Sequence, residues 1–493
     1  MSLEEYSLIL NRESALSHLL LIGVGPLPFY QSDRLYGFGI RAWQFALPLL
    51  DAGHRVTLVT CEFGIERESE ILIKYRSNPA QWADLEHLPL PQPNPRNFNL
   101  LLSRLDEIVR NARPDGIIAA GSTIATNLAA HLNTSLPMWM DMFGDLFAEV
   151  QAKLPFTKAG EEIEFFHQVL ARVLWRGDRF SVVSEMQRGA AIGQLGLMGR
   201  LNEYTLGEEL VWTIPCAMNG KIAPVRRRPL LRGKQVETGD FLVLCSGGFN
   251  TWTDVDTLFE GVEGAMGLNR RVHCVVTGGA ISGHHEDGYR RFQERVAKSP
   301  YEKRFHLLGW LPTADVDQIT LECDLGLNVD LPIYESVLGS RNRMLFWLQC
   351  GLPILTTVNT EISQLLSEHQ MAIGVPSGAG RTIAQKIHEA AMDPTEIKKR
   401  AVKAKRFAYE YLTFEETALP LVHWAKKPQR ARDNRARGEL TGSQTFNRVD
   451  ALWRAWAFPE ENSNHDPTLP RPHKPVIHTR PQGKSWWQRL LGY

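Results

Sequence analysis

Short, continuous apolar runs that end in glycine constrain the fold of this chain more than any other feature. The first run, HLLLIG from His18 to Gly23, lacks the alternation of a strand with one exposed face. Such a run is typical of a parallel strand that is buried on both faces. A helix is expected from about Ala42 to Asp51 and a second strand from Val56 to Thr60. Together these segments predict a β-α-β unit.

The same alternation occurs twice along the chain, which predicts an α/β protein with two Rossmann-like, doubly wound domains that face a central cleft. We place the domains at 1–225 and 226–425, followed by a basic, Pro-rich and partly disordered tail at 426–493 with a candidate helix at 446–458. Ligands are expected in the cleft, at the carboxyl ends of the strands. The expected strands lie at 115–120, 137–142, 179–184, 241–245, 272–276, 304–308, 324–328 and 353–357.

Composition narrows the class of protein. The 493 residues carry 55 Lys and Arg against 55 Asp and Glu, so no overall charge favours nucleic acid as a partner. No window approaches the roughly 18 consecutive apolar residues of a membrane-spanning helix. The six cysteines are scattered and form no C-x-x-C pair, which is typical of reduced, buried thiols. We therefore expect a soluble, cytoplasmic protein without a signal peptide.

The C-terminal tail has a different character. From Ala425 to Tyr493 it carries 13 Lys and Arg against 6 Asp and Glu, and it ends in the aromatic and basic stretch Trp486 to Leu491. Such a stretch favours weak, peripheral contact with the inner face of an anionic membrane. The alternative is an unfolded linker and tail end, which the composition of 467–481 also favours.

A candidate anion site lies between Tyr334 and Pro353. Ser340 is a good helix N-cap and Gly351 a good residue to follow a helix, so a short helix is expected to begin at about Arg341. Arg341 and Arg343 then fall in its first turn, where the positive end of the helix dipole disfavours cations unless an anion is also bound. Backbone N–H groups beside two guanidinium groups suit a diphosphate. Alternatively, both arginines point into solvent or pair with nearby acids.

The order of motifs over about 19–424 resembles the GT-B glycosyltransferases, in particular the retaining enzymes of family 4. No single motif is specific, but their joint order and spacing are. The matching residues are Gly37, Gly39, Arg41, Leu47, Leu50, Gly53, His54, Val56, Gly177, Asp178, Arg179, Val183, Ser184, Ile214, Pro215, Gly247, Gly248, Thr277, Gly278, Gly279, His306, Gly309, Trp310, Asp324, Gly326, Gly351, Leu352, Pro353 and Ile354.

The chain also departs from that family. Members commonly carry two glutamates eight positions apart, but the second position is Phe346 here, and Glu335 would replace the first with a register shift of three residues. Arg343 occupies a position where other members have lysine. Basic residues that usually follow the first glycines of the second half are absent, and so is a histidine after the strand that ends near Met142. Asp141 is one of the two polar residues closest to that place.

The resemblance implies roles for these positions in transfer of a sugar from a nucleotide donor. Cations and helix amides would stabilise the charge of the departing diphosphate, and an acid would bind hydroxyl groups of the donor. Each glycine is alternatively a turn residue, Arg41 an exposed helix residue, Glu335 a cap or ion-pair partner and Asp141 the end of a strand. The candidate catalytic residues are Glu335, Arg343 and Asp141; the candidate donor-binding residues are Gly37, Gly39, Arg41, Gly247, Asn250, Thr251, Gly339, Ser340 and Arg341.

The resulting hypothesis is a metal-independent hexosyltransferase without a cofactor, in which the nucleotide sugar is a substrate. The acceptor would be a glycan or a lipid-linked molecule of surface polysaccharide or glycoconjugate synthesis. Two alternatives stay open: an inert GT-B domain that binds a nucleotide sugar or glycan as a sensor or scaffold, and a nucleotide-sugar epimerase. The D-x-D pattern at Asp254 resembles a metal site, but we expect it to favour the N-terminus of a helix.

Overall fold

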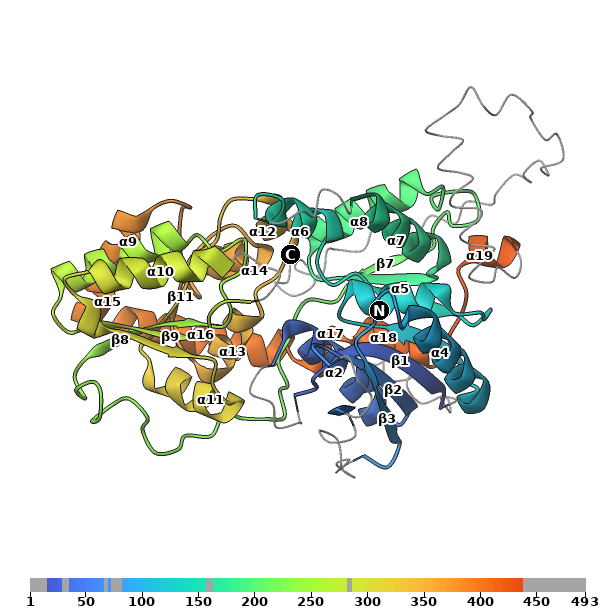
Figure 1. The fold of residues 1–493 in the computed structure, drawn as a ribbon, viewed down its shortest axis with the longest axis horizontal. Coiled ribbons are helices and arrows are strands. Elements are labelled where there is room, and N and C mark those ends of the chain that lie inside the picture. The colour runs from blue at the N-terminus through green and yellow to red at the C-terminus, as the bar shows by residue number, and fades with distance from the viewer. Residues whose placement is uncertain are drawn as a thin grey trace, which may run out of the picture.

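Two parallel sheets organise the chain (Figure 1). The computed structural model describes residues 16–28, 35–65, 70–71, 82–156, 163–281 and 286–437. Within them a seven-stranded sheet has the order β3-β2-β1-β4-β5-β6-β7, and a six-stranded sheet has the order β10-β9-β8-β11-β12-β13. Every pairing within the two sheets is parallel. This is the predicted α/β class, with two Rossmann-like domains.

The N-terminal domain begins with the predicted β-α-β unit and continues largely as alternating strands and helices, except that β3 follows β2 and α7 follows α6. Its elements are β1 (His18–Gly25), α2 (Gly37–Asp51), β2 (Arg55–Glu62), β3 (Leu85–Pro91), α4 (Phe98–Ala112), β4 (Gly116–Ala119), α5 (Thr123–His131), β5 (Met138–Asp141), α6 (Leu146–Lys153), α7 (Ile163–Arg176), β6 (Arg179–Val182), α8 (Glu185–Leu197) and β7 (Val211–Thr213).

The C-terminal domain repeats the alternation and ends in helices. Its elements are β8 (Phe241–Ser246), α9 (Val255–Leu268), β9 (Val272–Thr277), α10 (Glu286–Lys298), η2 (Glu302–Arg304), β10 (Phe305–Gly309), α11 (Thr313–Glu322), β11 (Leu325–Asn328), α12 (Tyr334–Leu338), α13 (Asn342–Cys350), β12 (Ile354–Thr357), α14 (Glu361–Glu368), β13 (Ile373–Val375), α15 (Gly380–Met392) and α16 (Thr395–Tyr411), followed by α17 (Phe414–Thr417), α18 (Leu419–Ala425) and α19 (Arg432–Ala436).

Both faces of each sheet are covered, which explains why the strands read as uninterrupted apolar runs. In β1, Leu20 packs into the core on one face of the sheet, and its neighbour Leu21 packs into the core on the other face. In β8, Val243 and Leu244 divide in the same way between the two cores of the C-terminal domain. A strand with one wet face would have alternated polar and apolar residues instead. The uninterrupted apolar runs in the sequence therefore indicated correctly that both faces of each sheet are covered.

Several predicted boundaries differ from the structure. The helix expected from about Ala42 begins earlier, at Gly37, so Gly37 to Arg41 belong to the start of α2. The helix predicted from Arg341 with Ser340 as its N-cap begins at Asn342, and Arg341 is the N-cap residue without a capping side-chain bond. Gly351 does end that helix, with φ of +72°. Three strands, β3, β7 and β13, were not predicted, because they are short or contain proline.

The chain crosses between the domains twice, and the crossings lie side by side. Met218 on the first crossing donates its backbone N–H to Leu412 and accepts from Phe414, which lie on the second. After Thr413 the chain packs on the N-terminal domain, where Gln44 of α2 donates to Thr417. Figure 1 shows α17 and α18, in orange, beside α2 and the blue strand β1. The predicted C-terminal domain, 226–425, included these helices, although they pack on the N-terminal domain.

The cysteines and the C-terminal tail are two further features for which the sequence made predictions. All six cysteines are free; burial raises the pKa of Cys61 and of Cys350 to about 12, so neither thiol is a reactive thiolate near neutral pH. The candidate helix 446–458 and the terminal stretch Trp486 to Leu491 lie outside the described residues. Among the helices that the structure describes, none has the length and apolar character needed to span a bilayer.

The turn that follows β9 is tightly packed against the turn that follows β8. Gly278 has φ of +89°, and a Cβ atom there would lie 2.3 Å from the carbonyl oxygen of Gly247. We expect Gly278→Ala to lower the free energy of unfolding by about 1–3 kcal/mol through backbone strain and overlap. Urea unfolding measures this change in the free energy of unfolding. Gly189→Ala, on an exposed turn of α8 with open space around it, is the control and should be neutral or stabilising by up to about 1 kcal/mol.

Candidate functional site

The N-termini of two helices from opposite domains meet in the cleft. Gly37 is the first residue of α2 and Asn342 the first of α13, and a Cβ atom on Gly37 would lie 2.6 Å from the side-chain nitrogen of Asn342. Neither helix has a capping side-chain bond or an acidic residue in its first turn. Their first backbone N–H groups therefore create positive potential at the same place. This is the setting in which an anion binds favourably.

Arg343 supplies a full positive charge at this place. Its Nη2 atom donates to the carbonyl oxygen of Gly248 at 2.8 Å, and its guanidinium lies 3.8–3.9 Å from where a Cβ atom of Gly247 would be. The side chain is half-buried, and no carboxylate of the described residues lies within 4.0 Å of it. Burial lowers the pKa of Arg343. A partly desolvated cation without a counter-ion, beside a glycine turn, is chemically suited to a phosphate group.

Arg341 has a different environment from Arg343, although both were predicted to contact a diphosphate. Its Nε donates to Asp330 at 2.8 Å, and its Nη1 and Nη2 atoms donate to the two carboxylate oxygens of Glu335 at 3.1 and 2.8 Å. The remaining N–H groups reach the carbonyl oxygen of Ser340 and the hydroxyl of Ser336. All five donors are used within the protein. The arginine is only 3% exposed.

This network of Arg341, Asp330 and Glu335 fixes the turn between α12 and α13. Burial alone would lower the pKa of Arg341, but the carboxylates of Asp330 and Glu335 raise it above its ordinary value. Gly339 closes the turn so tightly that a Cβ atom would lie 2.6 Å from the carbonyl oxygen of Glu335 and 2.7 Å from its carboxylate. The predicted donor-binding residue Ser340 follows, half-buried, directly before Arg341. The network thus holds the start of α13 in place.

Glu335 is the titratable group of this network that changes charge near neutral pH. Burial raises its pKa to about 7; the Arg341 guanidinium opposes the rise, and the negative charges of Glu149 and Asp330 add to it. Glu149 belongs to α6 of the N-terminal domain, so the charge of Glu335 is affected by both sides of the cleft. Its proton state therefore depends on pH and on the relative position of the domains.

Three other predicted residues line the turn after β8. Gly247 has φ of +89°, in the left-handed region that favours glycine, and Asn250 is half-buried and donates its backbone N–H to Thr253. Thr251 is 1% exposed, and its hydroxyl has no hydrogen-bond partner among the described residues. A buried hydroxyl without a partner costs about 1–3 kcal/mol, so such a group is expected to gain a partner from a ligand or water.

Arg41 and Asp141 come together, but as partners of each other. Arg41 donates from Nε and Nη2 to both oxygens of Asp141 at 2.9 and 2.8 Å, and from Nη1 to Pro215 and Gln44. Asp141 also accepts from Ser181, and each member of the pair is 1% exposed. Arg41 was predicted to bind the donor and Asp141 to act in catalysis. Their mutual pairing instead joins α2 to β5 in the core of the N-terminal domain.

Gly39 also has a packing explanation. A Cβ atom at this position would lie 2.1 Å from the carbonyl oxygen of Pro26, so glycine allows α2 to lie against the segment that follows β1. Gly37, by contrast, borders the side chain of Asn342 across the cleft. The two predicted glycines therefore act in different places, one within the domain and one at the interface.

Sequence reasoning missed Asp330 and Glu149. Asp330 could have been found, because it follows β11 at the carboxyl end of the sheet, where parallel strands place ligand-binding groups. Glu149 carries no comparable signal, since it is one of many acids on helix surfaces. The rejected D-x-D pattern behaves as predicted: Asp254 caps α9 by accepting from Thr257. Among the described residues, no group of three His, Cys, Asp or Glu side chains has an arrangement able to hold a metal ion.

Several solved structures are similar to this chain in fold. No family model and no curated protein sequence matches the chain. Among solved structures, HepE from Anabaena in complex with UDP-glucose is 16% identical with a TM-score of 0.58, over 83% of this chain and 98% of that one. Sucrose-phosphate synthase from Thermosynechococcus elongatus is 15% identical with a TM-score of 0.63, over 83% and 98%. WaaG, a glycosyltransferase involved in lipopolysaccharide biosynthesis, is 13% identical with a TM-score of 0.53, over 83% and 99%. These similarities confirm the GT-B fold.

The raised pKa of Glu335 predicts how stability depends on pH. Folding holds a proton on Glu335 that the unfolded chain releases, so the wild type loses stability as pH rises from about 4.5 through about 7. Glu335→Gln keeps the shape and removes the titration. We therefore expect the Tm of the variant minus that of the wild type to increase between pH 5 and pH 8, measured by calorimetry. A constant difference over this interval would show that Glu335 does not hold the proton.

Proposed function

We propose that this protein is a glycosyltransferase that transfers a sugar, with retention, from a nucleotide-sugar donor to an acceptor. The observation that carries the proposal is Arg343: a half-buried guanidinium without an acidic partner among the described residues, at the start of α13 and opposite the start of α2. Such a place is suited to the diphosphate of a nucleotide sugar. The solved complex of HepE with UDP-glucose supports the same class of donor, because the two chains share the fold.

In the proposed reaction the bond between the anomeric carbon and the diphosphate breaks, and negative charge grows on the leaving oxygen. Arg343 and the first amides of α13 would stabilise that charge without a metal ion or a cofactor. The φ of +89° at Gly247 lets the backbone of the turn follow the diphosphate closely. The start of α2, which already borders the start of α13 at Gly37, would lie against the same group and exclude water.

Arg341 and Glu335 have separate parts in this proposal. Arg341 positions the turn before α13, because all five of its donors are held by the protein. Glu335 accepts hydrogen bonds from Arg341 and, as a carboxylate, from hydroxyl groups of the donor. Its pKa of about 7 implies that donor binding improves as the pH rises through that value.

The role of Arg343 is tested by binding of nucleoside diphosphates, beginning with UDP. A ligand at a hundred times its dissociation constant adds about 2.7 kcal/mol to the folded state, which thermal unfolding detects. Arg343→Ala should weaken binding about 10- to 100-fold, because a hydrogen bond to a charged group contributes about 1.5–3 kcal/mol. Its unfolding temperature without ligand should stay close to that of the wild type.

Arg341→Ala is the matched control for this measurement. It leaves Asp330 and Glu335 buried without their partner, so we expect it to destabilise the free protein by about 3–5 kcal/mol. The two arginines are thus distinguished by the stability of the free protein, which should fall in Arg341→Ala and not in Arg343→Ala. Unchanged affinity in Arg343→Ala would refute the assigned role.

Turnover separates the enzyme from its main alternative, an inert GT-B domain that binds a nucleotide sugar or glycan as a sensor or scaffold. The missing second glutamate and the missing histidine of the resembled family are the observations that favour this alternative. An enzyme releases nucleoside diphosphate from a donor, slowly by hydrolysis or faster with an acceptor. Binding without any release would support the sensor.

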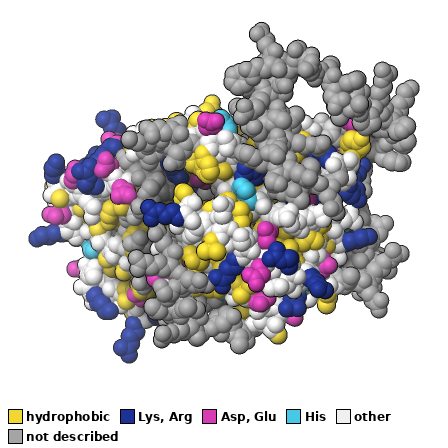
Figure 2. All heavy atoms as spheres, turned by 45° about the vertical axis from the view of Figure 1, so that its right-hand side comes forward, with side chains coloured by type: hydrophobic (Ala, Val, Ile, Leu, Met, Phe, Trp, Pro, Cys, Tyr) yellow, Lys and Arg dark blue, Asp and Glu magenta, His cyan; other side chains and the backbone are white. Residues whose placement is uncertain are grey.

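The acceptor, we infer, carries an apolar portion. Helix α12 packs against α6 and α8 at the cleft, and α7 packs against both α6 and α8. Large apolar side chains are exposed on α7 and α8 and just after α6. Figure 2 shows hydrophobic side chains that reach the surface in separate groups on one face of the molecule. The apolar rim consists of Leu154, Phe156, Ile163, Phe165, Met186 and Tyr334, exposed by 39–67%. A lipid-linked acceptor of surface polysaccharide or glycoconjugate synthesis, used at the cytoplasmic face of a membrane, fits this rim.

The apolar rim predicts a selective loss of acceptor use. Phe165→Ser and Met186→Ser should each raise the KM for an acceptor with an alkyl chain by about tenfold, because burying such a side chain contributes about 1.5–3 kcal/mol. Donor hydrolysis without acceptor should not change. Leu197→Ser, at the far end of α8 and 85% exposed, is the control. Equal effects in all three variants would contradict the assignment of the rim.

A further inference from the structure

Two hydroxyl groups lie side by side at the carboxyl ends of β8 and β9. Ser246 is the last residue of β8 and Thr277 the last of β9, and the two residues are paired in the register of the sheet. Ser246 is 6% exposed and Thr277 is 1% exposed. Two polar side chains are therefore buried at the end of the sheet where parallel strands place ligand-binding groups.

The alternation of side chains along a strand places both hydroxyls on the face of the sheet that α13 covers. Leu244 and Val275, two residues earlier in the same strands, belong to the core cluster that contains Trp347 of α13. The indole Nε1 of Trp347 donates to the hydroxyl of Ser246 at 3.1 Å. Helix α13 therefore lies directly over the end of β8.

Arg343 lies at the same end of this face. It precedes Trp347 by one turn of α13, so the two side chains project from the same side of the helix. Its Nη2 atom donates to the carbonyl oxygen of Gly248, two residues beyond the end of β8, at 2.8 Å. The guanidinium and the two hydroxyls thus gather where β8 and β9 end.

Neither hydroxyl donates its proton to any group among the described residues. The Thr277 hydroxyl has no hydrogen-bond partner there, and the Ser246 hydroxyl accepts from Trp347 but has no acceptor of its own. Burying an O–H group without an acceptor is costly, so such a group is expected to gain one from a ligand or water. Gly309 pairs with Thr277 on its other side and borders open space, since a Cβ atom there would meet nothing within 4 Å.

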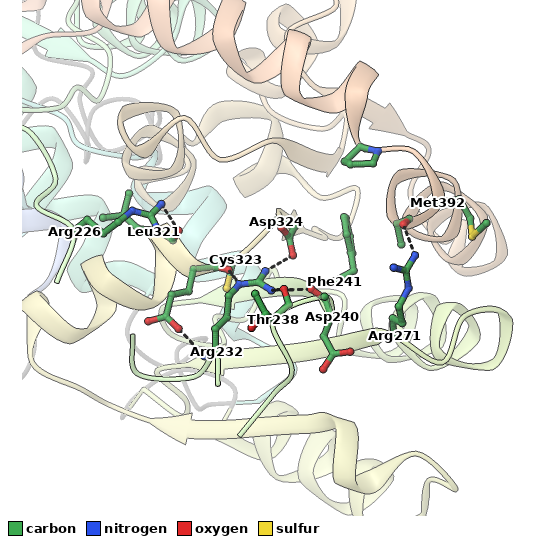
Figure 3. A pocket seen from close by; sticks show the side chains of 14 residues that line it. Arg226, Arg232, Thr238, Asp240, Phe241, Arg271, Leu321, Cys323, Asp324 and Met392 are labelled. Carbon is green, nitrogen blue, oxygen red and sulfur yellow. Dashed lines mark hydrogen bonds and ion pairs between the residues drawn. The ribbon is translucent and has the colours of Figure 1, made fainter. Parts of the chain in front are cut away.

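The amino ends of the same sheet have a different charge balance. A cavity of about 530 Å³ lies there, and Figure 3 shows Arg232 and Asp324 in it, joined by a hydrogen bond of 2.6 Å. Its lining includes three arginines and three carboxylates: Arg226, Arg232, Arg271, Asp240, Glu322 and Asp324. Opposite charges are therefore equal in number in that cavity, whereas the cleft end combines an arginine that lacks a counter-ion with two unused O–H donors.

We propose that Thr277 and Ser246 donate hydrogen bonds to a phosphate group of the nucleotide-sugar donor, beside Arg343; this inference rests on the proposed function. A place that offers a cation and O–H donors selects a group that only accepts, as phosphate oxygens do, over a sugar hydroxyl, which also needs an acceptor. The resembled family commonly has basic residues after the first glycines of the second half, and this chain lacks them. The two strand-end hydroxyls supply donors in their place.

Thr277→Val tests the inference, because it removes the hydroxyl and keeps the shape of the side chain. Calorimetric titration of the full chain with UDP should show about 10-fold weaker binding, since a hydrogen bond to a charged group is lost. The Tm of the ligand-free variant should not fall, because the hydroxyl has no partner among the described residues. A purely structural role would lower it. Thr277→Ser, which keeps a hydroxyl, should retain most of the affinity.

Thr213→Val is the matched control. The Thr213 hydroxyl is likewise buried without a partner among the described residues, but it lies in β7 of the other domain. Its removal should leave UDP binding unchanged. An equal loss of affinity in Thr213→Val, or equal affinity of Thr277→Val and the wild type, would overturn the inference and leave the proposed function standing.

Inorganic pyrophosphate, titrated in the same way, separates the phosphate site from the proposed function. Pyrophosphate that binds the wild type more tightly than Thr277→Val, while no nucleoside diphosphate binds, would support the phosphate site and contradict a nucleotide donor. Absence of binding of both pyrophosphate and nucleoside diphosphates to the wild type would overturn both proposals.

Discussion

The buried contact of Arg341 with Asp330 and Glu335 is the interaction on which the candidate site depends. It joins the end of β11 to the turn before α13, and so sets where the first amides of α13 point. Burying one cation with two carboxylates is costly unless the geometry and hydrogen bonding are good, and here every donor of the arginine is used. The benefit is a rigid support beside Arg343, which keeps its own charge available.

Much of the fold could be predicted from sequence because both domains use strands that are buried on two faces. Runs such as HLLLIG and FLVLC carry that information locally, and both form the central strands expected of them. The missed strands β3 and β7 show the limit. β3, LEHLPLP, mixes charge and proline into an outer strand, and β7 has only three residues. Such strands depend on neighbours that a single sequence does not reveal.

The candidate site was predictable in part. A cation in the first turn of a helix is locally unfavourable, and this conflict distinguishes Arg341 and Arg343 in the sequence alone. Sequence could not tell which of the two would be neutralised, because Asp330 and Glu335 meet Arg341 only through the fold of the turn. For the same reason it could not foresee that Arg41 and Asp141, a hundred residues apart, bind each other. Side-chain type can indicate chemistry, but pairing is a property of three-dimensional packing.

The two adjacent crossings at Met218 and Thr413 have a consequence for how the molecule can be divided. The N-terminal domain is completed by helices that follow the whole C-terminal domain in sequence. One of their residues, Trp424, packs edge-on against Trp139 of the seven-stranded sheet, with 5.6 Å between the two ring centroids. Its core is therefore discontinuous along the chain. A fragment cut at the first crossing would keep the seven-stranded sheet but would expose Trp139 and the surface of α2. The two domains are therefore distinct in space, but the N-terminal domain cannot be produced whole as one continuous piece of the chain.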